Sequence, residues 1–384
     1  MMNTHEGHSQ AAVWSLYQSS STGVQSAIVA NPYKPEADDL EGGVFAKDHR
    51  RAVERGDFAD GGKFRSVVKI LAALNNGSGE TIWMMDSGWL ISPDTVITAG
   101  HVVYDWKYNC QRAKEIKCYI GYAGRASVND EQYGVQARLG ERVVTTLEWV
   151  QSGPQIGTHD VAFIKLDRPF EGDLRMFPVQ NPTPVSGDVR LGVVGYPGDK
   201  ELPGSRGENG EGGALMYEEF ARTKYNLRDS TQHMIEYRVS TYGGQCGGPV
   251  LKIVEGKSLY VVIGTHCFGF GPGTSNFGTS IGGQYGVHYD NFIVLFDSPL
   301  FPNEAHYGIK ILSAGEITKT TASEAKLTQV TVKIEDSPNS SGLGEAQLDT
   351  VQNNHLPKRH DIVRPQKSIL DLIEGFGKPH TPVR

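Results

Sequence analysis

Residues 87–103 have the sequence SGWLISPDTVITAGHVV, and this stretch indicates the fold. Two short apolar runs rich in β-branched side chains flank a Pro-Asp pair, which is typical of a tight turn. The pattern predicts one strand at 89–91 and a second strand at 96–98. The second strand leads into an Ala-Gly step that presents His101. The stretch is therefore predicted to be a β-hairpin that delivers an ionisable ring at its end.

The same pattern of short apolar runs and turn residues continues from Phe64 to about Pro302. Short Val- and Ile-rich runs are separated there by Gly, Pro, Asn and Asp, and glycine supplies 46 of the 384 residues, as many turns require. Examples are SVVKILAAL (66–74), VAFIKL (161–166), VRLGVVGY (189–196), PVLKIV (249–254) and LYVVIGTH (259–266). No helical pattern of about 10 to 15 residues alternates with these runs, which argues against a parallel α/β sheet. We predict an all-β fold of many short strands in a sandwich or barrel.

The two ends of the chain have a different composition. Residues 1–43 are polar and lack a sustained apolar period, which predicts a leader segment or a loosely attached arm. Residues 303–384 form a largely irregular polar tail rich in Ser, Thr, Asn and Glu. Within this tail, SILDLIEGF (368–376) has apolar residues at helical spacing and predicts a short terminal helix.

Charge and cysteine content limit the partners and the compartment. The 37 basic and 44 acidic side chains give a net charge of -7, so no basic field is available for nucleic acid. No apolar run is long enough to span a membrane and no secretion signal is visible, so we expect an intracellular, cytoplasmic protein with reduced thiols. Cys110 and Cys118 lie eight residues apart without a second pair, which is not zinc-ligand spacing. We expect neither a metal nor a cofactor.

Three strings present reactive side chains at a strand end or a tight turn. His101 ends TAGH, Asp160 precedes the apolar strand of HDVAFIKL, and Cys246 lies between two Gly pairs in GGQCGG. Glycines beside a nucleophile let the backbone turn tightly and direct N–H groups into one pocket, as an oxyanion hole requires. Each residue alone is more often structural, but the three strings together, in the order His, Asp, Cys, indicate nucleophilic catalysis.

These strings resemble the three active-site motifs of the chymotrypsin-like (trypsin-like) proteases. The similarity is greatest to the glutamyl endopeptidase branch and extends over about residues 44–300. It implies a protease domain at 44–302 with two six-stranded antiparallel β-barrels, the first at about 64–175 and the second at about 185–300. The active site is then expected in the cleft between the barrels.

The resemblance also implies roles for individual residues. His101 corresponds to the general base, Asp160 to the residue that orients it, and Cys246 to the nucleophile. The N–H groups of Gly244 and Cys246 correspond to the oxyanion hole. The family has Ser where this chain has Cys246. The cysteine could be natural, as in the picornavirus-type proteases, or an engineered change that traps the enzyme, and the sequence leaves both open. A cysteine can act here because an adjacent imidazole activates a thiol.

Two further residues match positions that line the primary substrate pocket in the glutamyl endopeptidases. These are Thr241, five residues before the nucleophile, and His266. Because a hydroxyl and an imidazole can donate hydrogen bonds to a carboxylate, they predict cleavage after Glu and, more weakly, after Asp. The string VFAKDHRRAV resembles the start of a mature enzyme, which makes Val44 the candidate N-terminus and residues 1–43 a propeptide.

The predicted function is therefore an endopeptidase that forms a covalent acyl-enzyme on Cys246, with a protein or peptide as its substrate. A second hypothesis is a catalytically inactive protease fold that serves as a peptide-binding or scaffold module. In either case the tail is a candidate docking site for a regulatory partner. No nucleic acid or membrane partner is expected.

Overall fold

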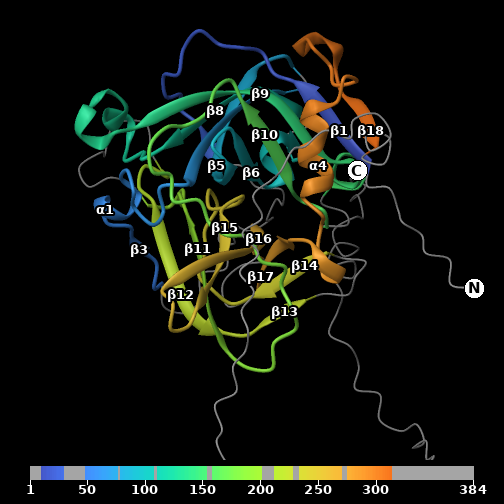
Figure 1. Ribbon diagram of the computed structural model, residues 1–384. Helices are drawn as coiled ribbons and strands as arrows, with labels where there is room; N and C mark the ends of the chain where they lie inside the picture. The colour runs from blue at the N-terminus through green and yellow to red at the C-terminus, as the bar shows by residue number, and fades with distance from the viewer. Residues whose placement is uncertain are drawn as a thin grey trace, which may run out of the picture. The chain divides into compact units, whose positions relative to one another are not determined.

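The computed structural model describes residues 10–29, 48–76, 78–107, 110–153, 158–200, 212–227, 233–269 and 275–313. All of them belong to one compact unit, residues 1–323. They form two sheets that are antiparallel except for one short pairing, as Figure 1 shows, so the predicted all-β class is confirmed. The predicted terminal helix at 368–376 lies outside the described residues.

The first sheet closes into a barrel of six strands. Its strand order is β9-β10-β6-β5-β4-β8, and β8 pairs again with β9. These strands are β4 (Val67–Asn75), β5 (Thr81–Ser92), β6 (Thr95–Thr98), β8 (Gln111–Ile120), β9 (Gln136–Thr146) and β10 (Ala162–Leu166). The short strands β2 (Ile28–Val29) and β7 (Tyr104–Asp105) pair with β5 and β8. The hairpin predicted from residues 87–103 is the β5–β6 pair, in which Trp89 lies opposite Ile97.

The second sheet has eight strands. Its order is β13-β14-β17-β16-β15-β11-β12-β3. The strands are β3 (Arg51–Ala52), β11 (Val189–Gly195), β12 (Tyr217–Thr223), β13 (Tyr225–Leu227), β14 (Met234–Tyr237), β15 (Pro249–Val254), β16 (Leu259–Gly269) and β17 (Asn276–Ser280). Only Lys224 separates β12 from β13, so this bent segment pairs with β11 at one end and with β14 at the other. The first predicted barrel is therefore closed, and the second predicted barrel corresponds to this eight-stranded sheet.

Continuous apolar runs mark the strands that are buried on both faces. The β4 sequence VVKILAALN has eight buried residues in succession, including Lys69, whereas β12 is half-buried or exposed at every position except Glu219. A strand at the centre of a barrel that is also covered from outside needs apolar side chains on both faces. The core extends from the first barrel to the segment after β17, where Phe292 stacks on Phe163 with ring centroids 5.6 Å apart.

Residues 10–16 and 310–313 require a correction of the expected chain ends. Residues 10–15 are strand β1 (Gln10–Ser15), which pairs with β9 and with β18 (Lys310–Ser313), so these two segments extend the first sheet. Trp14 is fully buried and its Nε1 donates a hydrogen bond to the carbonyl of Ala113. The expected loose arm does not hold for this segment, because AAVWSL is apolar enough to complete the sheet. The assignment of residues 1–43 as a propeptide stays a prediction.

Helices are short and lie between or beside the strands. They are α1 (Arg55–Phe58), α2 (Gly100–Val103), α3 (Leu147–Ser152) and α4 (Asp290–Ile293), with 3-10 turns at Arg125–Asn129, Glu131–Tyr133, Gly283–Tyr285, Val294–Asp297 and Ala305–Tyr307. Figure 1 shows α4 beside the first barrel, near β1. Among the described residues, none of the helices has the length and apolarity to cross a membrane.

Candidate active site

Helix α2 holds His101 directly after strand β6. The backbone N–H of His101 donates to Asp160 Oδ1 at 2.9 Å, and the ring Nδ1 lies 2.8 Å from Asp160 Oδ2. Gly100 permits this approach, because a Cβ there would lie 2.9 Å from the Trp149 ring and 3.1 Å from Asp160 Oδ1. One carboxylate therefore fixes both the backbone and the ring of His101.

Asp160 is fully buried just before strand β10, and the second barrel holds it in place. Its backbone carbonyl accepts hydrogen bonds from Thr279 Oγ1 at 2.9 Å and from Cys267 Sγ at 3.1 Å. Cys267 is fully buried, and burial raises its pKa well above the ordinary value, which fits a structural thiol rather than a nucleophile.

Cys246 lies in a turn that packs directly against the first barrel. The N–H of Ser87, on β5, donates to the Cys246 carbonyl at 3.0 Å, and Ser87 Oγ donates to the Gly244 carbonyl at 2.7 Å. Gly244 and Gly247 have φ values of 96° and 81°, which glycine adopts without strain. The turn therefore needs its glycines, as the sequence predicts.

The expected oxyanion donors have no competing backbone partner. Within the ranges that the structure describes, no backbone carbonyl accepts a hydrogen bond from the N–H of Gly244 or of Cys246. The neighbouring Gly247 N–H, by contrast, donates to the His266 carbonyl at 2.7 Å. The first two groups are thus available to a substrate oxygen, as an oxyanion hole requires.

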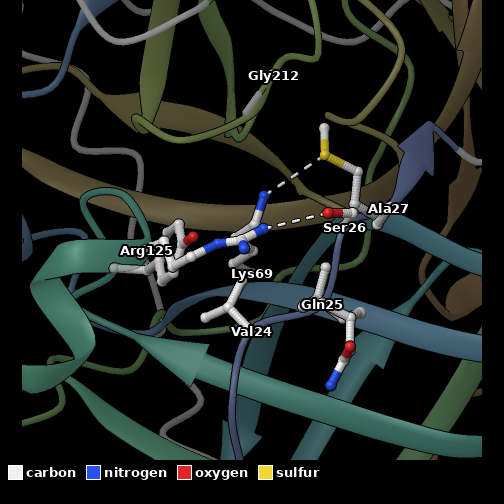
Figure 2. A pocket seen from close by; sticks show the side chains of 10 residues that line it. Val24, Gln25, Ser26, Ala27, Lys69, Arg125 and Gly212 are labelled. Atoms are coloured by element: carbon white, nitrogen blue, oxygen red, sulfur yellow. Dashed lines mark hydrogen bonds between the residues drawn. The ribbon is translucent and has the colours of Figure 1, made fainter. Parts of the chain in front are cut away.

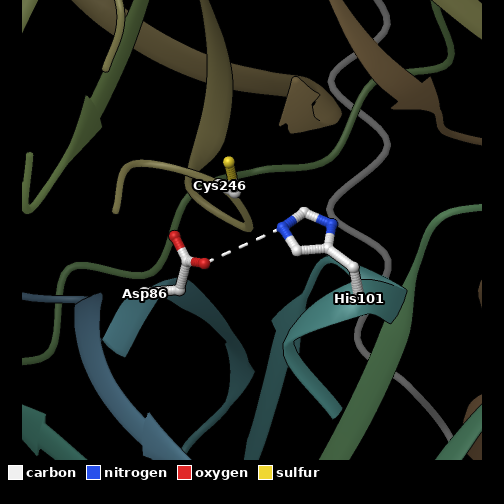
Figure 3. A group of neighbouring side chains, drawn as sticks. All are labelled: Asp86, His101 and Cys246. Atoms are coloured by element: carbon white, nitrogen blue, oxygen red, sulfur yellow. Dashed lines mark ion pairs between the residues drawn. The ribbon is translucent and has the colours of Figure 1, made fainter. Parts of the chain in front are cut away.

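Asp86 is a second carboxylate in the site, and the sequence analysis does not identify it. Figure 3 shows Asp86 from β5, His101 from α2 and Cys246 from its turn as neighbours, with the Asp86 carboxylate directed toward the His101 ring. One ligand atom from each side chain lies within 4.8 Å of the other two. Asp86 Oδ2 is 3.7 Å from His101 Nε2, which is an ion-pair distance but too long for a hydrogen bond. The signal in the sequence is a lone acid inside the apolar run IWMMDSGWL, where an unpaired carboxylate is rare.

Burial and mutual charge shift the pKa values of this cluster. Burial raises the pKa of Asp86 to about 6, against the opposing effect of His101. Burial lowers the pKa of His101, but the charge and hydrogen bond of Asp160 outweigh it and the net pKa is well above 6.5. Burial and the charge of Asp86 raise the pKa of Cys246 to about 11, although its hydrogen bond with His101 acts in the opposite direction. At neutral pH the cysteine is therefore a thiol beside an imidazole whose affinity for protons is raised.

Thr241 and His266 both lie close to the turn that carries Cys246. The backbone N–H of His266 donates to the Gly248 carbonyl at 2.9 Å, and its ring Nδ1 lies 2.6 Å from the Tyr237 hydroxyl. Burial and the charge of His101 lower the pKa of His266 to about 3, so its ring is neutral at physiological pH. Thr241 is fully buried, and its hydroxyl has no hydrogen-bond partner among the described residues.

The predicted N-terminus Val44 lies outside the described residues. The chain is described again from residue 48, where a buried ion cluster begins. The Arg50 guanidinium donates to Asp48 Oδ1 at 3.0 Å and to Asp199 Oδ1 at 2.9 Å, and only 1% of its side chain is exposed. This cluster attaches the segment after Val44 to the loop that follows β11.

A small pocket is lined in part by Met85, the residue before Asp86. Figure 2 shows its lining, to which residues 24–27, Lys69 and Arg125 contribute. The Lys69 amine is buried, donates to the Gly213 carbonyl at 2.6 Å, and lies 5.3 Å from the centres of the Tyr122 and Tyr196 rings. Its positive charge is one of the influences that lower the pKa of Asp86.

Comparison with known proteins finds a family model and a curated relative that match part of this chain. The model of the trypsin-like peptidase domain matches residues 86–264. A glutamyl endopeptidase of Bacillus licheniformis is 28% identical over 191 residues, which are 49% of this chain and 49% of that protein. The chain therefore aligns with about half the length of this curated relative.

Two solved structures are also similar to this chain. A Glu endopeptidase has a TM-score of 0.45 and 20% identity, with 65% of this chain and 97% of that chain covered. The protease Anisep from Arthrobacter nicotinovorans has a TM-score of 0.43 and 16% identity, with 63% and 96% covered.

Proposed function

The chain contains a trypsin-like peptidase domain and belongs with the chymotrypsin-like proteases, close to the glutamyl endopeptidase branch, and from this premise we propose that it is an endopeptidase with Cys246 as nucleophile. One observation carries the proposal. Asp160 binds Nδ1 of His101, which leaves Nε2 on the side of the ring that faces Cys246 and Asp86. This is the relation of orienting acid, base and nucleophile that acyl transfer requires.

The proposed chemistry proceeds in two stages. Cys246 Sγ attacks the scissile carbonyl carbon while its proton moves to His101 Nε2, and the N–H groups of Gly244 and Cys246 stabilise the oxyanion. The C–N bond then breaks, and the proton on Nε2 transfers to the leaving amine. In the second stage a water molecule loses a proton to His101 and attacks the thioester, which releases the carboxylic acid and restores the thiol.

The electrostatics of the site support this sequence of steps. Asp160 raises the pKa of His101 well above 6.5 despite the opposing effect of burial, which stabilises the imidazolium that forms when His101 holds the thiol proton. A thiol with a pKa of about 11 needs such a base, because little thiolate forms spontaneously at neutral pH. The imidazolium formed on attack then lies between two carboxylates, Asp160 and Asp86.

For substrate preference we propose cleavage after Glu and, more weakly, after Asp. The buried hydroxyl of Thr241 lacks a partner among the described residues, and the backbone of His266 is hydrogen-bonded to the nucleophile turn, so both are suited to a pocket beside Cys246. Because the His266 ring is neutral, such a pocket would recognise a carboxylate by hydrogen bonds rather than by opposite charge.

Fluorogenic peptides that end in Glu, Asp, Phe, Arg or Leu test the proposal with the full chain, reduced and free of metal. We expect cleavage after Glu, its loss in Cys246→Ala, and its retention in the matched control Cys118→Ala, which removes another fully buried thiol. Activity confined to Cys246→Ser would contradict the cysteine nucleophile. Cleavage after Phe or Arg would contradict the pocket, and no activity in any form would favour the inactive binding module.

A further inference from the structure

The cluster of Asp86, His101 and Cys246 has a chemical property that proteolysis does not require. Its three side chains are buried, with 0%, 2% and 5% of each residue exposed. Neither carboxylate oxygen of Asp86 has a hydrogen-bond partner among the described residues, and the same holds for His101 Nε2. A buried carboxylate without a hydrogen bond costs free energy unless a cation compensates it.

The donor set is one that a zinc ion accepts. Thiolate, imidazole and carboxylate are its usual protein ligands, and three protein ligands with a fourth open position are common in accessible zinc sites. A tetrahedral ion with bonds of about 2.0–2.3 Å holds its ligand atoms about 3.3–3.6 Å apart. Asp86 Oδ2 and His101 Nε2 are 3.7 Å apart, and the ligand atoms of the whole group lie within 4.8 Å, so small side-chain rotations would suffice.

His101 makes the hydrogen bond that is typical of a metal-binding histidine. Such a ring usually donates its second N–H to a carboxylate, which fixes the tautomer and strengthens the other nitrogen as a ligand. Asp160 accepts at 2.8 Å from Nδ1 and also binds the backbone N–H of His101. The lone pair of Nε2 is therefore directed to the side on which Asp86 and Cys246 lie.

We propose that Asp86, His101 and Cys246 form a reversible binding site for Zn²⁺ or a similar thiophilic divalent cation. Binding replaces the thiol proton of Cys246 by the metal, and a proton held on His101 Nε2 is released as well, whereas no electron is transferred. The ion occupies the sulfur and the nitrogen assigned to nucleophile and base, so the loaded protein is inactive as a peptidase. That last consequence rests on the proposed function, whereas metal binding itself does not.

Cobalt(II) gives a readout that is independent of activity, because a cobalt–thiolate bond adds a charge-transfer absorption in the near ultraviolet. The full-length protein, reduced and freed of metal by a chelator, is titrated with Co²⁺ and then with Zn²⁺. We expect the thiolate band to appear with Co²⁺ and to disappear as Zn²⁺ displaces it. The Cys246→Ala variant should lack the band, and the control Cys118→Ala should retain it.

Two variants distinguish the proposed metal ligand Asp86 from Asp160, which only orients the ligand His101. Asp86→Asn should weaken Co²⁺ binding by more than about tenfold, and Asp160→Asn, which alters only the residue behind His101, by about 10- to 100-fold. A second measurement needs no variant and therefore applies even if a variant fails to fold. In the unmodified chain, Zn²⁺ should protect Cys246 from an alkylating reagent, and mass spectrometry maps the modified cysteines. Absence of a thiolate band, or a band that persists in Cys246→Ala, would overturn the site.

The peptidase assay keeps the two proposals apart. Zn²⁺ should abolish cleavage, and a chelator should restore it. If the chain binds Co²⁺ through Cys246 but cleaves no peptide, the proposed function fails and the metal site stands. If it cleaves peptides yet gives no cobalt–thiolate band, the metal site alone fails.

Discussion

Gly247 shows how closely the nucleophile turn and the first barrel approach each other. A Cβ at this position would lie 2.2 Å from the Ser87 carbonyl oxygen and 2.2 Å from Thr98 Oγ1. The backbone φ of 81° is also in the region that side chains disfavour. Two independent constraints, one steric and one conformational, therefore require glycine directly after Cys246.

The substitution Gly247→Ala tests this tightness. Backbone strain and overpacking together should lower the free energy of unfolding by about 2–5 kcal/mol. The variant Gly256→Ala is the matched control, because Gly256 has a φ of 78° but a Cβ added there would meet no atom within 4 Å. It should lose only about 1–2 kcal/mol. Denaturant titration measures both, and equal losses would contradict the steric part.

Asp48 links stability to pH at the scale of one residue. Burial raises its pKa, but hydrogen bonds from Arg50 and Lys200 outweigh this and hold it well below the ordinary value. A depressed pKa contributes stability that is present above the ordinary value, near pH 4, and is lost as the pH falls toward the pKa of the folded state. The Asp48 carboxylate thus stabilises the neutral protein and ceases to do so in acid.

We therefore expect Asp48→Asn to lower the melting temperature at neutral pH and to have a smaller effect below about pH 4. The exposed Asp188→Asn is the control, for which no comparable change is expected. Melting curves across the acid range provide the measurement. A deficit in Asp48→Asn that grows on acidification would reverse the sign and contradict the account.

At the scale of elements, strand β1 is part of the first sheet. It lies between β9 and β18, and residues 11–14 are fully buried. Its apolar run is a single short one in a polar segment, so periodicity alone gives little indication of the role. The open edge of β9 is what makes it a strand, because an edge that faces apolar side chains accepts a further strand.

Replacing Trp14 by Ala should therefore lower the free energy of unfolding by about 3–5 kcal/mol, the usual loss for a buried aromatic side chain. Tyr17→Ala, three residues away and 49% exposed, should change it by no more than about 0.5 kcal/mol. Chemical denaturation of both variants provides the comparison. Similar values for the two would show that β1 contributes no packing energy.

At the scale of the whole molecule, strand β1 should determine whether the N-terminal piece stays associated after the chain is cleaved. If the chain is cleaved before Val44, we expect the piece that carries residues 10–29 to remain bound, because β1 has ladders to both β9 and β18. Cleavage at a protease site inserted among residues 31–43, followed by size-exclusion chromatography under native and denaturing conditions, tests this. Separation of the two pieces under native conditions would contradict it.

The barrel class and the site motifs follow from local sequence. Alternation of short β-branched runs with turn residues predicts the strands, and the Gly pairs around Cys246 predict a tight turn. Both signals are local because strand and turn conformations depend on neighbouring residues. The sequence around Asp86 has no comparable motif. Its place in the site depends on its distance from His101 and Cys246, which only the folded chain sets.

The sequence by itself thus determined a β protein with His101, Asp160 and Cys246 in protease-like motifs. Only the tertiary structure decided that residues 10–15 complete the first sheet, and that Asp86 meets His101 and Cys246. The physical reason is distance along the chain. Asp86 and Cys246 are far apart in sequence, and the packing of the two sheets brings them together. The hydrogen bond from the Ser87 N–H to the Cys246 carbonyl is part of that packing.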